Sequence, residues 1–172
     1  MKFTKKFAAV AVAALALVGT TACSNSKSND SSSSKSADIP TKITKKTTVV
    51  FWHGMTGTQE KTLQSLTKDF EKKNPNITVK LENQGKYNDL QAKINSTLQS
   101  PNNLPTITQA YPGWLLNAAN SKRLVDMTPY INNSKIGWGS AKKSDIREEL
   151  LKGAQIKGTQ YGIPFNKSVE ML

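Results

Sequence analysis

Most of the chain carries hydrophobic patterns typical of alternating strands and helices. Thr47–Trp52 (TTVVFW) is β-branched and aromatic with almost continuous apolar character, which predicts a strand buried on both faces. Leu63, Leu66 and Phe70 then recur at the spacing of one helix face. We expect this helix to begin at Thr56, where the spacing of a capping box occurs, and to end at the Asn-Pro pair that follows it.

The next segments continue the alternation. Ile77–Asn83 (ITVKLEN) alternates apolar and polar residues, which predicts a second strand. Tyr87–Leu98 places its large apolar residues on one helical face, and Thr106–Tyr111 (TITQAY) is predicted to be a third, short strand. An order of β-α-β-α-β is typical of a parallel sheet whose helical connections cover its faces, so we predict an α/β fold.

The remainder of the chain gives weaker patterns. Gly113–Asn120 and Ser144–Ala154 are predicted to be helices, with Ser144 or Asp145 as the cap of the second one. Gly158 is predicted to lie in a hairpin turn before Gln160–Phe165.

Aromatic residues follow the predicted strands. In open α/β sheets, ligands bind beyond the carboxyl ends of the strands. Four rings are expected at this rim, from Trp52, Tyr87, Tyr111 and Trp114. Aromatic faces pack against the C–H faces of sugars, so we predict a carbohydrate-binding rim. The alternative for Trp52 and Tyr87 is packing in the core, and for Tyr111 and Trp114 it is a turn around Pro112-Gly113 whose rings are merely exposed.

Two further residues near this rim favour plainer roles. His53 has no catalytic partner in the sequence, so we expect it to make a structural hydrogen bond at the end of the first strand. Lys86 is expected to be solvent-exposed, with contact to a ligand as the alternative.

The sequence lacks the residues of common enzyme sites. The single histidine excludes a multi-histidine metal site, and the motifs for a serine nucleophile elbow, a dinucleotide and a phosphate loop are absent. Only Glu82 and Asp89 lie near the rim, at one edge, so glycoside hydrolysis lacks its usual acid pair. We therefore predict a binding protein with no cofactor and no metal. A surface-anchored carbohydrate-active hydrolase and a polymer-binding adhesin are the alternatives.

The positive charge does not indicate nucleic-acid binding. The chain has 24 Lys and Arg and 12 Asp and Glu, a net charge of +12. Half of this excess falls in residues 1–46, and the other basic residues are scattered along the sequence as on an ordinary solvated surface. A nucleic-acid interface would instead need a basic stripe on the folded part.

The first 22 residues are typical of a secretory signal peptide. Met1–Lys6 is positively charged, Phe7–Val18 is an unbroken apolar run, and Gly19–Ala22 is made of small residues. The apolar run has 12 residues, whereas about 20 are needed for a helix to cross a bilayer. An uncleaved membrane anchor is the alternative.

Cys23 follows the small-residue segment and resembles the lipid-modified cysteine of bacterial lipoproteins. Thr21 and Ala22 fit the motif, while Thr20 stands where that family favours leucine. The resemblance implies that Cys23 is acylated and holds the protein at the membrane, where two acyl chains suffice for stable anchoring. An unmodified thiol is the alternative. Ser24–Lys46 holds eight Ser and five Lys and is predicted to be a disordered tether.

The folded part resembles a known family through several segments in order. These segments are FWHGM, then FEKKNPNITV, then LPTITQAYPGWLLNAANSKRLVDMTPYI, and finally GTQYGIPFNKSVEML. Together they resemble extracellular solute-binding proteins of bacterial ABC importers, of the family 1 carbohydrate and glycerol-3-phosphate type. The likeness spans residues 47–172. It implies a periplasmic-binding-protein-like lobe, with a mainly parallel sheet flanked by helices and the second lobe missing.

The same resemblance implies a function and partners. It implies that the protein captures a sugar or glycerol-3-phosphate-like solute and delivers it to ABC permease subunits. It further implies a monomer, anchored by lipid on the extracytoplasmic face of the membrane, that binds no nucleic acid. Because such proteins clamp the ligand between two lobes, we expect this chain as given to bind weakly or not at all.

Individual residues match the family's binding positions. In the glycerol-3-phosphate branch, the residues corresponding to Tyr87 and Ser168 contact the ligand. Trp52 and Tyr111 occupy positions that face the cleft in the wider family. Pro112 stands where that branch has a glutamate, which makes a sugar as suitable a solute as glycerol-3-phosphate.

Overall fold

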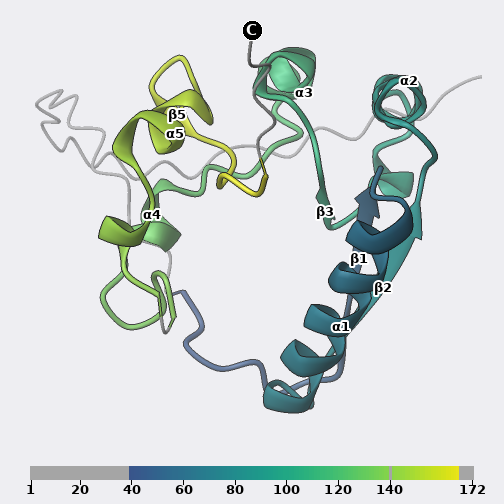
Figure 1. The fold of residues 1–172 in the computed structure, drawn as a ribbon. Helices are drawn as coiled ribbons and strands as arrows, with labels where there is room; N and C mark the ends of the chain where they lie inside the picture. The colour runs from purple at the N-terminus through teal and green to yellow at the C-terminus, as the bar shows by residue number, and fades with distance from the viewer. Residues whose placement is uncertain (1–38, 140, 167–172) are drawn as a thin grey trace, which may run out of the picture. The chain divides into compact units, whose positions relative to one another are not determined.

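The computed structural model describes residues 39–139 and 141–166. Three strands, β1 (Thr47–His53), β2 (Ile77–Asn83) and β3 (Ile107–Thr108), form one sheet in the order β2-β1-β3 (Figure 1). Both neighbours run parallel to β1. The predicted α/β fold with a parallel sheet is therefore confirmed.

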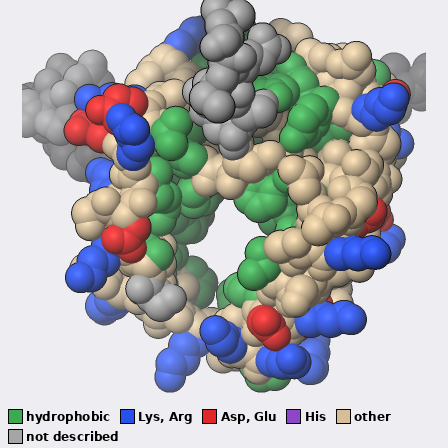
Figure 2. Space-filling view, in the orientation of Figure 1, with side chains coloured by type: hydrophobic (Ala, Val, Ile, Leu, Met, Phe, Trp, Pro, Cys, Tyr) green, Lys and Arg blue, Asp and Glu red, His purple; other side chains and the backbone are tan. Residues whose placement is uncertain are grey.

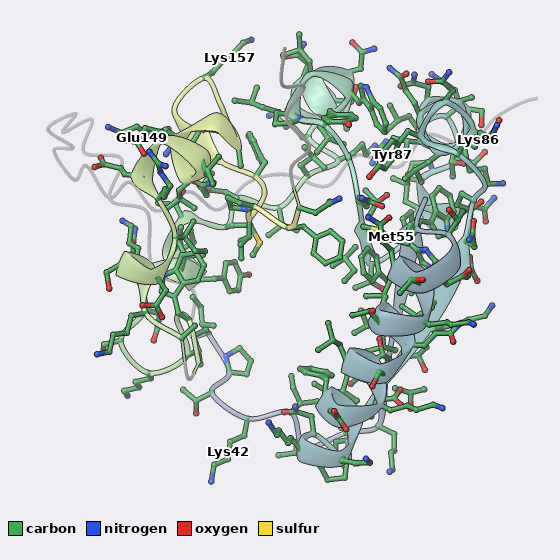
Figure 3. All side chains as sticks on the ribbon, viewed as in Figure 1. Lys42, Met55, Lys86, Tyr87, Glu149 and Lys157 are labelled. Carbon is green, nitrogen blue, oxygen red and sulfur yellow. The ribbon has the colours of Figure 1, made fainter. Side chains whose placement is uncertain are left out.

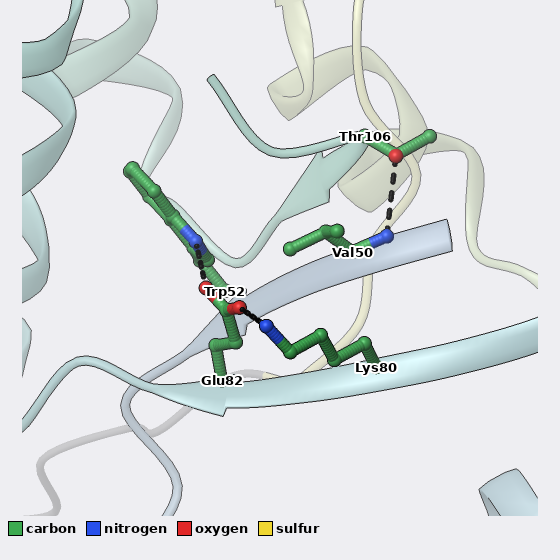
Figure 4. A network of polar contacts seen from close by, with 5 residues as sticks. All are labelled: Val50, Trp52, Lys80, Glu82 and Thr106. Carbon is green, nitrogen blue, oxygen red and sulfur yellow. Dashed lines mark hydrogen bonds and ion pairs between the residues drawn. The ribbon is translucent and has the colours of Figure 1, made fainter. Parts of the chain in front are cut away.

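The first strand is buried only toward its carboxyl end, so the prediction of burial on both faces along its length is wrong. Thr47 and Thr48 are exposed, whereas Trp52 and His53 are buried. The cause is unequal pairing, because β1 pairs with β2 over its full length and with β3 over two residues. Before β3 begins, the Val50 amide donates to the hydroxyl of Thr106 at 3.1 Å (Figure 4).

Helix α2 (Tyr87–Thr97) supplies the core that lies under the sheet's carboxyl end. Leu90 is 0% exposed, and it packs with Ile94 and Trp52 in one buried cluster. The predicted apolar face of this helix is thus confirmed at its centre. Burying these side chains removes apolar surface from water, which is the main favourable contribution to folding.

Helix α1 (Gly57–Lys73) connects β1 to β2 along the sheet. Only part of its predicted apolar face is buried. Leu63 is buried, but Leu66 and Phe70 are 60% and 43% exposed. Their common face was expected to be buried, and within the described residues it is not. Thr56 is the N-cap residue, yet its side chain makes no capping hydrogen bond, so the predicted capping box does not form.

The elements after β3 are short. The third strand has two residues instead of the predicted six, and the 3₁₀ helix η2 (Pro112–Leu115) follows it after three residues. The other short helices are η1 (Pro101–Asn103), α3 (Leu116–Asn120), α4 (Thr128–Ile131), η3 (Lys143–Asp145) and α5 (Glu148–Gly153). Arg147 is the N-cap residue of α5, so Ser144 and Asp145 do not occupy that position and the predicted helix is too long.

The predicted hairpin turn at Gly158 is confirmed. Strands β4 (Gln155–Ile156) and β5 (Thr159–Gln160) pair antiparallel across Lys157 and Gly158. Both turn residues have positive φ, 51° and 79°, as a two-residue hairpin loop requires. The side chain of Gln160 is buried, and its Nε2 donates to the carbonyl of Leu151, which connects the hairpin to α5.

Residues before the predicted boundary at Thr47 already contact the fold. The carbonyl of Ile43 accepts from Asn76 Nδ2 at 2.9 Å, and Lys46 Nζ donates to the carbonyl of Pro75 at 2.8 Å. The predicted signal peptide, Cys23 and most of the predicted tether lie outside the described residues. In the part of the chain that is described, no helix has the length and apolarity to cross a membrane.

Candidate functional site

Three aromatic rings meet beyond the carboxyl ends of the strands. Tyr87 begins α2, Tyr111 follows β3, and Trp114 lies in η2. Their ring centroids are 4.9 to 6.3 Å apart in edge-to-face arrangements. Tyr111 is 49% exposed, and the other two rings are half-buried (Figure 3 labels Tyr87). We call these three residues the aromatic rim, and it contains three of the four rings expected there.

Trp52, the fourth ring, lies beneath the rim. Its side chain is 4% exposed and belongs to the buried cluster, against which Trp114 packs. The indole Nε1 donates to Glu82 Oε2 at 2.8 Å (Figure 4). Trp52 therefore supports Trp114 from below, and little of its own surface is open to a ligand.

Glu82 is fully occupied by structural contacts. Lys80 Nζ lies 2.6 Å from Glu82 Oε1 while the Trp52 indole binds the other oxygen. The hydrogen bond from Lys80, followed by that from Trp52, lowers the pKa of the Glu82 carboxyl. A carboxylate held ionised in this way is poorly suited to act as a general acid.

Gln109 organises the polar side of the rim, and the sequence analysis did not identify it. Its side chain is 8% exposed, and Oε1 accepts from the Gly54 amide at 3.0 Å. Nε2 donates to the Tyr87 hydroxyl at 3.1 Å and to Asn166 Oδ1 at 3.0 Å. One buried amide thus joins the end of β1, the start of α2 and the segment after β5.

The Tyr87 hydroxyl is oriented by this network. It accepts hydrogen bonds from Gln109 Nε2 and, at 3.3 Å, from Asn166 Nδ2. Because a phenolic oxygen has two lone pairs and one proton, two accepted bonds direct the remaining O–H elsewhere. The Tyr87 O–H therefore points away from Gln109 and Asn166.

Two glycines allow the backbone to pack closely against Tyr87 and the first turn of α2. A Cβ on Gly54 would lie 3.3 Å from the Tyr87 ring and 3.3 Å from the Gly85 carbonyl. Gly85 has a φ of +84°, and a Cβ there would lie 2.7 Å from Asp89 Oδ2. That oxygen accepts from the Lys86 amide at 2.9 Å and so caps α2. Asp89 is therefore engaged in helix capping.

His53 makes the structural hydrogen bond predicted for it. Its ring is 1% exposed, and Nδ1 accepts from the Met55 amide at 3.3 Å. Burial lowers the pKa of this imidazole, and the nearby Glu60 carboxylate opposes the shift only partly. His53 is thus a neutral part of the core. Lys86 is exposed, as expected.

Some predicted residues cannot be placed, and others were missed. Ser168 and Cys23 lie outside the described residues. Asn166 stands in the same PFNKS segment as Ser168, and the sequence analysis took only the serine from it. The available signal for Gln109 was a large polar side chain inside a strand-like run, two residues before Tyr111.

The aromatic rim does not line either of two hollows in the described structure. These hollows, of about 300 and 430 Å³, lie in the loop after α4 and between α2 and α3. None of the three rim residues lines them. Over residues 39–139 and 141–166, no group of three or more His, Cys, Asp or Glu side chains is placed to hold a metal ion. The chemistry available at the rim is ring stacking and hydrogen bonding.

A protein-family model matches more than half of this chain. The model described as bacterial extracellular solute-binding protein matches residues 65–172. No curated protein matches the chain in a sequence comparison.

Solved structures with the same fold cover about seven tenths of this chain. A family 1 extracellular solute-binding protein from Alicyclobacillus acidocaldarius has 25% identity and a TM-score of 0.59, covering 71% of this chain and 28% of its own. The sugar-binding protein MalE from Xanthomonas citri has 30% identity and a TM-score of 0.56, covering 69% and 28%. The GacH receptor of Streptomyces glaucescens, at 21% identity with a TM-score of 0.56, covers 68% and 28% and shows the fold alone. This chain thus spans less than a third of the length of these proteins.

Proposed function

Because this chain belongs to the bacterial extracellular solute-binding proteins, we propose that it captures a sugar or a glycerol-3-phosphate-like solute for an ABC importer. In this proposal no bond is made or broken, and the solute passes to permease subunits in the membrane. The sugar-binding neighbour from Xanthomonas citri favours a carbohydrate.

The observation that carries this proposal is the aromatic rim with its oriented hydroxyl. Tyr87, Tyr111 and Trp114 present ring surfaces that can pack against sugar C–H groups. The Tyr87 O–H, fixed by Gln109 and Asn166, donates to a hydroxyl or phosphate oxygen of the solute. Ser168 is proposed to add a further contact. Trp52 is proposed to act through Trp114, since its own ring is covered.

A hydrolase is a poorer fit to the described residues. Glu82 is ion-paired with Lys80, and Asp89 caps α2, so neither acid near the rim is available as a proton donor. The described rim offers contacts without a reacting group.

Ligand-observed saturation-transfer NMR tests the proposal, since this method detects weak binding. The purified chain is mixed in turn with maltotriose, mannotriose and glycerol-3-phosphate. We expect transfer to the sugar C–H protons, with loss of most of the signal in the Trp114→Ala variant. Trp138→Ala is the matched control, because Trp138 lines the hollow after α4 and not the rim. Equal signals from the Trp114→Ala and Trp138→Ala variants would contradict the proposed role of the rim.

The same samples separate binding from hydrolysis. Under the proposal, maltotriose and mannotriose are unchanged after prolonged incubation with the protein. New reducing ends that disappear in the Glu82→Gln variant would instead favour the hydrolase.

We further propose that Cys23 is acylated and anchors the protein at the extracytoplasmic face of the membrane, with residues 1–22 as signal peptide and the Ser-rich segment as tether. Metabolic labelling with a radioactive fatty acid tests this. We expect label in the wild-type chain and none in Cys23→Ser. Label in both variants, or in neither, would contradict acylation at this residue.

A further inference from the structure

Six lysines gather at the amino end of the sheet, opposite the aromatic rim. Helix α1 runs back along the strands, so its last turns lie beside the residues that precede β1. Hydrogen bonds join these segments directly, from Lys46 Nζ to the Pro75 carbonyl and from Asn76 Nδ2 to the Ile43 carbonyl. We call the following residues the amino-end patch: Lys42, Lys45, Lys46, Lys68, Lys72 and Lys73.

The amino-end patch has a net positive charge. All six lysines are exposed. The carboxylates on the same turns of α1 are Asp69, which pairs with Lys72 at 3.1 Å, and Glu71, which accepts from the Val79 amide at 2.7 Å. Six lysines and two carboxylates leave a charge of +4. Figure 2 shows Lys and Arg side chains around the lower end of the view, where Figure 3 labels Lys42.

Helix stability explains only part of this charge. Lys72 and Lys73 lie in the last turn of α1, where cations interact favourably with the helix dipole. Lys42 and Lys45 precede β1 and belong to no helix. Their position beside the end of α1 adds charge that the dipole does not require.

The patch also adjoins the proposed tether. The chain that leads from Cys23 enters the fold at Ile43–Lys46, within the patch itself. A 17-residue helix is about 25 Å long, so the patch and the aromatic rim lie at well-separated ends of the sheet. A surface that met the patch would leave the rim uncovered.

We propose that the amino-end patch docks on the anionic phospholipid headgroups of the membrane that carries the anchor. The inference rests on the proposed localisation. The tether keeps the patch close to the bilayer, so docking is an intramolecular event with a high effective concentration. Weak electrostatic attraction is then sufficient, and the rim faces away from the lipid.

Vesicle co-sedimentation of the Cys23→Ser chain tests the patch without acylation. The vesicles contain phosphatidylcholine alone or phosphatidylcholine mixed with phosphatidylglycerol. A lysine near an anionic surface adds about 1 kcal/mol, so the triple variant Lys42→Gln/Lys45→Gln/Lys73→Gln should weaken binding to anionic vesicles by about a hundredfold. Salt at roughly 1 M, where the Debye length is about 3 Å, should abolish the wild-type binding.

The matched control removes the same charge elsewhere, in the triple variant Lys61→Gln/Lys135→Gln/Lys143→Gln, whose lysines are exposed and outside the patch. We expect it to bind within about threefold of wild type, because attraction falls off within a Debye length. All variants keep residues 1–22, so any binding through the apolar run appears equally with phosphatidylcholine alone.

Equal loss in the two triple variants would overturn the proposal, since net charge alone would then explain the binding. Absence of wild-type binding to anionic vesicles would overturn it as well. Neither result would affect saturation transfer from solutes, which depends on the rim. Failure of the patch is therefore distinguishable from failure of the proposed solute binding.

Discussion

The two ends of the sheet differ in how their polar groups are used. At the carboxyl end, Gln109 is buried and its amide makes three hydrogen bonds that fix the position of Tyr87. At the amino end, the lysines are exposed, and among contacts between described residues only Lys46 of this patch donates to a backbone carbonyl. One end is therefore suited to short-range, oriented contacts, and the other to attraction that depends on charge and salt.

This difference follows from the burial around each end. Buried polar groups must be hydrogen-bonded, so a network at the carboxyl end is fixed in geometry and sensitive to single changes. Exposed lysines lose little hydration on folding and keep their side-chain conformational freedom. Substitutions at the carboxyl end should consequently affect stability, and those at the amino end should affect association with charged surfaces.

The largest effect is expected under the carboxyl end, for Leu90→Ala. Leu90 is 0% exposed, and truncating a buried leucine removes transfer free energy and leaves a cavity. We expect the free energy of unfolding to fall by about 2–5 kcal/mol in urea denaturation. Leu66→Ala is the control, because Leu66 is 60% exposed and its loss should stay within about 0.5 kcal/mol. Equal losses would show that the core is not where the structure places it.

The next effect is expected for Gln109→Leu. This change leaves the Gly54 amide without its acceptor and removes the donors to Tyr87 and Asn166. An unsatisfied buried group costs about 1–3 kcal/mol, measurable by the same denaturation. Asn76→Ala at the amino end removes an exposed hydrogen bond to Ile43 and should cost less. A larger loss for Asn76→Ala would reverse the comparison between the two ends.

Gly85→Ala should have a smaller effect at the same end. Gly85 has a φ of +84°, and the added Cβ would lie 2.7 Å from the Asp89 carboxylate that caps α2. The left-handed conformation costs an alanine about 1–2 kcal/mol, and chemical denaturation should show a loss of that order. Gly113→Ala is the control, since a Cβ there meets nothing within 4 Å. A neutral Gly85→Ala would mean that the turn relaxes without strain.

Acid should weaken the carboxyl end through His53. Burial lowers the pKa of this imidazole from its ordinary value of 6.5, so the unfolded chain binds more protons than the folded one below that pH. The free energy of unfolding should therefore fall as the pH drops below 6.5, until the folded-state pKa is passed. Glu82, whose pKa is lowered from 4.5, adds a second loss at lower pH.

Denaturation curves recorded between neutral and acidic pH measure this dependence. The His53→Gln variant should lack the decline just below pH 6.5 and keep the decline near the lower pH. An unchanged profile in that variant would assign the first decline to another group.

The sequence predicted the regular part of the fold because periodic patterns are strong there. The strands at Thr47 and Ile77 and the helix from Tyr87 were predicted close to their observed bounds. The elements after β3 were predicted less well, because they contain only two to six residues and local hydrogen bonds decide their ends. The exposure of Leu66 and Phe70 could not be predicted, since helical periodicity gives a face but not what covers it.

The sequence predicted the aromatic rings of the candidate site but not its polar contacts. Strand order alone brings Tyr87, Tyr111 and Trp114 to one end of a parallel sheet. The contact of Gln109 with Asn166 joins residues 57 positions apart, and no local pattern encodes it. The amino-end patch was missed for the same reason, because its lysines are scattered along the sequence and gather only when α1 folds back toward β1.

The smallest effect on stability is expected at the amino end, for Lys45→Gln with Lys73→Gln. Both side chains are exposed, so their replacement should change the free energy of unfolding by no more than about 0.5 kcal/mol. Lys68→Gln, within the same patch, provides a second test of this tolerance. If the free energy of unfolding is unchanged while vesicle binding is weakened, these lysines act in association with the membrane and not in folding. A loss as large as that of Gln109→Leu would instead make the lysines structural, and the two ends of the sheet would no longer differ in kind.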